Sequence, residues 1–236
     1  MTAAFPFAAL TAEVEAWIVQ ALALTPIPLP PDLAAATGTW KGAPVTISTR
    51  AYRGGPVRFA RFVRLVGPDL EIGNLLCLPE PAYPLPIFGA DLVGLPRATA
   101  MLAADLSPTL PPGPDRDRQL APFARLRAAH PPLPPGGLLP AWCADWFSPH
   151  ALYTRVTPEQ LPVAVAAFWD LPRCFVEVAH HATPQPDLAP EIARRQDGYA
   201  TAHRTDDKGL GLLAKMFGVP WADRFLAEVL FPPLPR

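Results

Sequence analysis

The sequence lacks several features that would place it in a well-marked functional class. Its three cysteines, Cys77, Cys143 and Cys174, lie far apart and form no CxxC pair, zinc-type spacing or disulfide framework. No apolar run approaches the ~18 residues that a membrane span requires. The N-terminal stretch carries Glu13 and Glu15 and has no basic start, unlike a signal peptide. We therefore expect a protein of a reducing cytoplasm with no membrane segment.

The sequence also lacks a large excess of charge of one sign, a glycine-rich nucleotide-binding loop and a cluster of metal ligands. The net charge is −1, whereas nucleic-acid binding usually calls for a basic domain. No GxGxxG motif follows a strand and opens a helix, and the GLG at Gly209 falls inside a helical pattern. The adjacent His180 and His181 have no suitably spaced acidic or cysteine partner. These absences indicate no nucleic-acid partner, no bound nucleotide cofactor and no metal.

What the sequence does contain is half hydrophobic residues in a chain of 236, enough for one sizeable core. The patterning indicates strands in the first half and helices mainly in the second, which is typical of an α+β fold. We find no domain boundary and expect a single domain over residues 1–236. The expected strands are residues 39–41, 45–52, 57–66, two between 70 and 93, and 98–105. The expected helices are residues 11–24, a short one at LAPFARLRAA, 157–169, 190–217 with breaks near 198 and 205–211, and 220–230, while 174–178 fits a strand or a helix.

Two polar residues interrupt the strands within residues 70–93. Strand side chains alternate between faces, so Asn74 shares a face with Ile72 and Leu76, and Asp91 shares one with Val93. A carboxyl buried on such a face is costly and responds by raising its pKa. Asp91 therefore either satisfies a nearby backbone donor or works as an acid, and the pattern leaves both interpretations open.

Four segments stand out in order along the chain: LPEPAYPLPIFGADLV at 78–93, AADLSPT at 103–109, WFSPHALYTR at 146–155 and DDKGLGLLAKMFGVPWADRF at 206–225. Together they resemble the ferredoxin-dependent bilin reductases. The resemblance implies a three-layer α/β/α sandwich with a central antiparallel sheet, and a bilin held between the sheet and the C-terminal helices. It also implies that biliverdin IXα itself takes electrons from reduced ferredoxin, with no bound cofactor. The protein would then bind, orient and donate protons.

The resemblance implies two proton donors on opposite sides of a flat ligand. Asp91 matches the family's aspartate in the sheet, and Asp207 matches the aspartate of its C-terminal helical region. Burial against an apolar ring system would raise the pKa of either carboxyl toward neutrality. Asp105, in contrast, fits ordinary turn chemistry as the first residue of Asp-x-Ser-Pro.

Three positions bear on the product. Asn74 stands where the phycocyanobilin-forming branch has a histidine, and Ala60 and Phe62 stand where that branch has a histidine and a glutamate. Asn74 with two aspartates resembles the branch that reduces the C15–C16 bridge and then the A-ring, as in phycoerythrobilin synthesis. The alternatives are a two-electron reductase that stops at 15,16-dihydrobiliverdin, a phycocyanobilin-type reductase and a non-catalytic bilin carrier.

The remaining substrate contacts follow from the same resemblance. Arg58 and Arg64 are expected on the strand face of Ala60 and Phe62, and are the first choices for the two propionates. The other expected contacts are Ala60, Phe62, Phe88, Arg204 and Lys208. The basic residues could also receive an acidic ferredoxin. We expect a monomer, because the substrate entrance and the ferredoxin face must both stay open.

Overall fold

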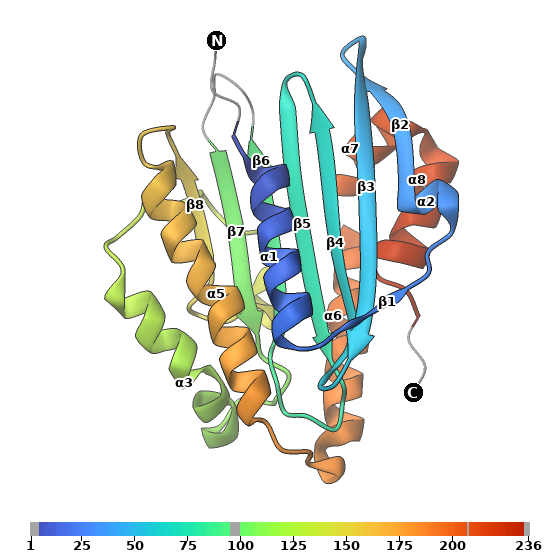
Figure 1. Cartoon of the computed structure of the whole chain (residues 1–236). Helices are drawn as coiled ribbons and strands as arrows, with labels where there is room; N and C mark the ends of the chain where they lie inside the picture. The colour runs from blue at the N-terminus through green and yellow to red at the C-terminus, as the bar shows by residue number, and fades with distance from the viewer. Residues whose placement is uncertain (1–4, 95–99, 207, 234–236) are drawn as a thin grey trace.

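The computed structural model describes residues 5–94, 100–206 and 208–233, and the side chains at positions 206 and 208 are outside that description. A single antiparallel sheet lies between two layers of helices (Figure 1). This three-layer α/β/α sandwich confirms the fold class expected from the sequence.

The sheet is a meander in which each long strand pairs with the next. The strands are β1 (Thr25–Ile27), β2 (Ala35–Trp40), β3 (Ala43–Gly54), β4 (Val57–Gly67), β5 (Leu70–Pro79), β6 (Ile87–Gly94), β7 (Ala100–Ser107) and β8 (Leu152–Val156). Their order is β1-β3-β4-β5-β6-β7-β8, and β2 also pairs with β3. The short links between successive strands explain the antiparallel pairing. Sequence patterning missed β1 and β8, which are short strands at the two ends of this order.

The helices divide between the two faces of the sheet. The helical elements are α1 (Phe7–Ala21), α2 (Pro31–Ala34), α3 (Pro114–Ala129), α4 (Cys143–Trp146), α5 (Leu161–His181), a 3-10 turn (Pro186–Leu188), α6 (Ala189–Asp206), α7 (Lys208–Phe217), α8 (Val219–Phe225) and a π-helical turn (Leu226–Leu230). Helices α1 and α5 cover one face, and α6, α7 and α8 lie behind the other (Figure 1). No helix among the described residues has the length and apolar character needed to span a membrane.

Strand alternation gives each face its own hydrophobic core. Phe62 and Phe88 point to the α1–α5 face, where Phe88 packs on Phe175 of α5 with ring centroids 6.0 Å apart. Phe59 and Leu76 point to the other face and pack under the C-terminal helices. A residue of the sheet is therefore assigned to one face or the other by its register alone.

Two helices differ from their expected limits for clear local reasons. Helix α5 begins at Leu161 and runs to His181, so Pro162 falls in its first turn, where a missing N–H costs nothing. Residues 174–178 are helical. Helix α6 continues through Gly198 instead of breaking there. Close packing explains the glycine, because a Cβ at this position would lie 2.3 Å from the ring of Trp146.

Candidate active site

The two polar residues predicted from residues 70–93 are direct cross-strand partners. Asn74 of β5 pairs with Asp91 of β6, and the side-chain amide of Asn74 donates a hydrogen bond to Asp91 Oδ1. Both lie on the face that is turned to the C-terminal helices, in line with Leu76. Asp91 is exposed, so the expectation of a buried carboxyl was wrong. Its neighbours along this face of β6 are Gly89, which has no side chain, and the half-buried Val93.

A buried arginine fixes the orientation of Asn74. Arg61 of β4 is 2% exposed, and its Nη1 donates a hydrogen bond to Asn74 Oδ1. Its Nε donates to the carbonyl of Leu230 at 2.8 Å, and its guanidinium lies 5.3 Å from the ring centroid of Phe231. Because the amide oxygen of Asn74 accepts from Arg61, the amide NH₂ must face Asp91. Arg61, Asn74 and Asp91 thus form a directed hydrogen-bond chain that ends at the accessible carboxyl.

The buried carboxyl on this face belongs to Asp105 of β7, which sequence analysis had read as a turn acid. It is 2% exposed and directly opposite Gly89 in the sheet. Ser148 donates to it from its backbone N–H at 2.8 Å and from Oγ at 2.5 Å, and Ser107 Oγ donates at 2.7 Å. Burial raises the pKa of Asp105 to about 6, although these hydrogen bonds pull the pKa down.

The raised pKa of Asp105 predicts a pH-dependent contribution to stability. Between the ordinary value of 3.8 and about 6, the folded chain holds a proton that the unfolded chain releases. The contribution of Asp105 should therefore fall as pH rises through this window, by up to roughly 3 kcal/mol, and stay constant above it. The check is the free energy of unfolding of wild type minus that of Asp105→Asn, measured from pH 4 to 7. A pH-independent difference would contradict the assignment.

Aromatic rings from α6 and the C-terminal segment close the site on the helix side. Tyr199 and His203 stand one helical turn apart on α6, with ring centroids 4.4 Å apart, and His203 stacks on Phe231 at 4.8 Å. The rings of Phe147 and Trp142 also contact His203. Burial, and next the charge of Arg61, lower the pKa of His203 to about 3, so its imidazole is neutral at neutral pH. Burial raises the pKa of Tyr199, so it stays a phenol.

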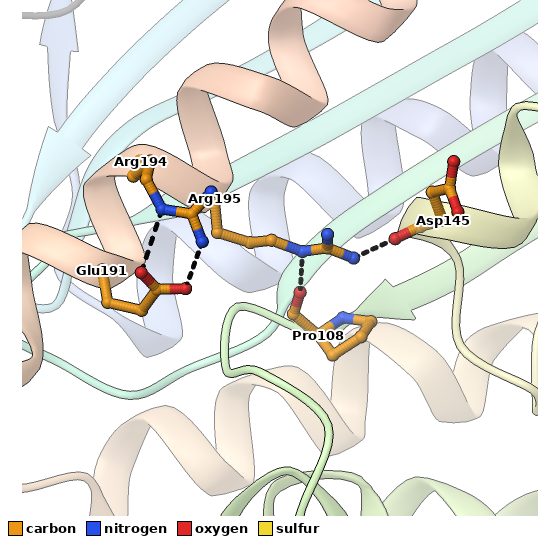
Figure 2. A network of polar contacts seen from close by, with 5 residues as sticks. All are labelled: Pro108, Asp145, Glu191, Arg194 and Arg195. Atoms are coloured by element: carbon orange, nitrogen blue, oxygen red, sulfur yellow. Dashed lines mark hydrogen bonds and ion pairs between the residues drawn. The ribbon is translucent and has the colours of Figure 1, made fainter.

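Arg195 links α6 to Pro108, just after β7, and to Asp145 of α4, as Figure 2 shows. Its Nε donates to the carbonyl of Pro108 at 3.4 Å, and its Nη2 donates to the carbonyl of Asp145. Its guanidinium also lies 4.2 Å from the ring centroid of Trp146. Arg194 points elsewhere and pairs with Glu191 within the helix. Because residues four apart share a helix face, anchoring Arg195 places Tyr199 and then His203 toward the sheet.

Four of the expected substrate contacts lie on the opposite face of the sheet. Ala60, Phe62 and Phe88 are fully buried in the core under α1 and α5. Arg64 also faces α1, where its Nη2 pairs with Glu15 at 2.6 Å. Strand alternation separates these side chains from Asn74 and Asp91, so direct contact with a ligand lying over those two residues is ruled out for them in this register.

Two other expected contacts, Arg58 and Arg204, are on the side of the C-terminal helices. A register shift between Val57 and Phe59 breaks the alternation of side chains at Arg58. Burial lowers the pKa of Arg58, and the negative charges of Asp197 and Glu80 partly oppose this effect. Arg204 of α6 donates from Nη1 to the carbonyl of Phe231 at 2.8 Å.

Two predicted site residues cannot be compared with the geometry. Lys208 begins α7, but its side chain is outside the described part of the chain. Asp207 lies outside the described residues altogether. Within residues 5–94, 100–206 and 208–233, no group of three or more His, Cys, Asp or Glu side chains is arranged to hold a metal ion.

Sequence analysis did not single out Arg61, nor the aromatic rings that include Tyr199 and His203. The available signal for Arg61 was its position between Phe59 and Val63 on an apolar strand face, where a charged residue must find partners. Tyr199 gave no such signal, because a tyrosine in an amphipathic helix is ordinary.

The fold thus presents an oriented carboxyl on the sheet face that is turned to the C-terminal helices. The model of the ferredoxin-dependent bilin reductase family matches residues 11–232, and the chain belongs to that family.

Named relatives agree with this membership. The phycocyanobilin:ferredoxin oxidoreductase of Trichodesmium erythraeum is 31% identical over 227 residues, which cover 92% of this chain and 89% of the relative. The phycoerythrobilin:ferredoxin oxidoreductase of Synechococcus sp. (strain RCC307) is 30% identical over 230 residues, 90% of this chain and 86% of the relative. The fold matches the crystal structure of tomato phytochromobilin synthase in complex with biliverdin, with a TM-score of 0.86 at 19% identity, over 95% of this chain and 82% of that one.

Proposed function

We propose that this chain reduces biliverdin IXα with electrons from reduced ferredoxin, first at the C15–C16 bridge and then at the A-ring, to give a phycoerythrobilin-type product. The observation that carries the proposal is the hydrogen-bond chain Arg61–Asn74–Asp91. It presents an accessible, oriented carboxyl on the sheet face that is turned to the C-terminal helices. Asn74 supplies an amide where a phycocyanobilin-forming enzyme would have a second proton-carrying ring.

Asp91 is the proton donor in this proposal. Ferredoxin delivers electrons one at a time to the bound bilin, and each reduction raises the basicity of the ring system until it takes a proton. Asp91 is within reach of a ligand because it is exposed, and its partner Asn74 is held by the buried Arg61. The tetrapyrrole itself would exclude water from Asp91 and so raise the pKa of its carboxyl when bound.

The propionates require cations on the side of the C-terminal helices. Arg58, Arg204 and Lys208 keep this proposed role, whereas Arg64 is engaged by Glu15 on the far face. We further propose that the protein acts as a monomer in a reducing cytoplasm and carries no bound cofactor of its own. An acidic ferredoxin would be received by the basic side chains around the bilin.

The experiment that tests the proposal is anaerobic incubation with biliverdin, ferredoxin and a reducing system, followed by chromatography of the bilins. The expected result is one-to-one binding and conversion to a four-electron product through 15,16-dihydrobiliverdin. Binding with an unchanged bilin spectrum would identify a carrier. Accumulation of 15,16-dihydrobiliverdin would identify a two-electron reductase, and phycocyanobilin would contradict the reading of Asn74.

Asp207 provides a prediction about the second reduction. If Asp207 supplies the A-ring proton, Asp207→Asn should keep the local shape but stop the reaction at 15,16-dihydrobiliverdin, with A-ring reduction slowed by a factor of about 100 or more. Product chromatography after single-turnover reduction provides the measurement. The adjacent substitution Asp206→Asn is the matched control and should give the full four-electron product. A normal rate and product for Asp207→Asn would mean that the A-ring proton comes from elsewhere.

A further inference from the structure

Gly89 creates a gap on the sheet between two carboxyls. Gly89 is the direct cross-strand partner of Asp105, and Asp91 lies two residues further along the same strand and face. Asp91 and Asp105 are therefore diagonal neighbours across the β6–β7 pair, with the side-chain-free Gly89 at the corner between them. Diagonal positions of this kind are typically about 7–8 Å apart, which is within the reach of one intervening group.

The hydroxyl of Tyr199 fills this gap from the helix side. A Cβ built on Gly89 would lie 3.0 Å from the Tyr199 hydroxyl oxygen, so only glycine leaves it full room here. The side chain of Tyr199 is 4% exposed. A hydroxyl can donate one hydrogen bond and accept others, so a phenol placed between two carboxyls can donate to one and accept from the other when that carboxyl is protonated.

The groups that act electrostatically on Tyr199 include both carboxyls. Asp105 and Asp91 raise its pKa from the sheet, while Arg61 of β4 lowers it and Cys143 of α4 raises it. Arg195 anchors the preceding turn of α6, and Gln196 Nε2 donates to the carbonyl of Pro79 at 2.9 Å. The phenol is thus held over Gly89 by contacts that do not involve a ligand.

We propose that Tyr199 and Asp105 form a second, buried arm of the site that returns a proton to Asp91 after its first donation. The proposal rests on the proposed reduction, which consumes more protons than one carboxyl carries. A flat ligand on the sheet would cover Asp91 and cut its direct exchange with water. The same ligand, by excluding water, would raise the pKa of Asp105 further, so that this carboxyl holds a proton on the protein side of the ligand. That proton would then allow the next donation without release of the intermediate.

The transfer balances with one proton and no change in oxidation state. Asp91 gives its proton to the reduced bilin and becomes a carboxylate. The Tyr199 O–H bond breaks toward Asp91 while the phenol oxygen takes the proton of Asp105. The charge ends on Asp105, where the N–H of Ser148 and the hydroxyls of Ser148 and Ser107 are already placed to donate to it. Before the transfer, either hydroxyl can rotate to accept from the protonated carboxyl.

The test separates the first proton-coupled reduction from those that follow. Stopped-flow single-turnover reduction of bound biliverdin would be measured for wild type, Tyr199→Phe and Gly89→Ala. Phenylalanine keeps the volume but removes the proton, and alanine displaces the hydroxyl while keeping the phenol. Tyr52→Phe is the matched control, because its hydroxyl bonds to Glu15 at 2.6 Å on the opposite face.

We expect Tyr199→Phe and Gly89→Ala to keep the first reduction within about twofold and to slow the second roughly tenfold or more. The partly reduced bilin should accumulate in both, and Tyr52→Phe should behave as wild type. If the Tyr199 and Gly89 variants match the control, or slow both reductions equally with weaker bilin binding, the relay is overturned and Tyr199 only packs. If wild type fails to reduce biliverdin, the proposed function fails independently of the relay. If Tyr199→Phe does not fold, Gly89→Ala still decides.

Discussion

Replacing Asp91 with Asn should reduce the rate of biliverdin reduction by a factor of about 100 to 10,000, the range for loss of a positioned proton donor. Asparagine keeps the size of the side chain and can accept from the amide of Asn74, so binding should change little. Electron transfer to the bilin does not need Asp91, whereas the following protonation does. A one-electron-reduced bilin radical should therefore accumulate from the start of the reaction.

The measurement is anaerobic electron paramagnetic resonance and absorbance during reduction, with the bilin dissociation constant determined separately. Asp69→Asn, in the exposed turn between β4 and β5, is the matched control and should leave rate and radical level unchanged. A near-normal rate for Asp91→Asn would show that Asp91 is not the proton donor. Asp105 would then be the next candidate on this face. A large loss of binding without radical accumulation would make Asp91 a binding residue instead of an acid.

Much of this site could be predicted from the sequence because strands alternate and successive strands pair. Asn74 and Asp91 interrupt apolar faces at matching positions, and a short connection joins their strands, so their pairing follows from an antiparallel hairpin. The register between β4 and β5 was harder. The family resemblance assigned Ala60 and Phe62 to the site, whereas the structure puts Arg61 on the face of Asn74 and Asp91 and Ala60 and Phe62 on the other.

Burial of the two aspartates could not be predicted from local pattern. Asp105 precedes Ser and Pro as turn acids do, but it lies within β7, and the loop that buries it contains Ser148, 43 residues later. Asp91 sits among apolar neighbours in the sequence, but its exposure depends on which helix crosses β6. Contacts between residues so far apart in the sequence cannot be predicted from the residues of a single strand.

Arg61 carries the second large expected effect, on both stability and catalysis. Arg61→Met keeps an unbranched side chain in the core but leaves the carbonyl of Leu230 and the amide oxygen of Asn74 without their donor. We expect the free energy of unfolding to fall by about 3 kcal/mol, the cost of leaving buried polar groups unpaired. Urea denaturation provides the measurement. Arg61→Lys should recover only part of this loss, because an ammonium cannot reproduce the fork of a guanidinium.

Arg61 acts on the reaction through Asn74, so the two residues should be coupled. Without Arg61, the Asn74 amide is free to flip and present its oxygen to Asp91, which places two acceptors together and disfavours the carboxylate that forms on proton donation. Arg61→Lys should therefore slow reduction roughly tenfold in an otherwise wild-type chain and much less in an Asn74→Ala background. The double-mutant cycle on single-turnover rates measures this coupling, with Arg64→Lys on the opposite face as the control. Additive effects of the two substitutions would mean that Arg61 stabilises the C-terminal segment through Leu230 and Phe231 and has no part in orienting the proton donor.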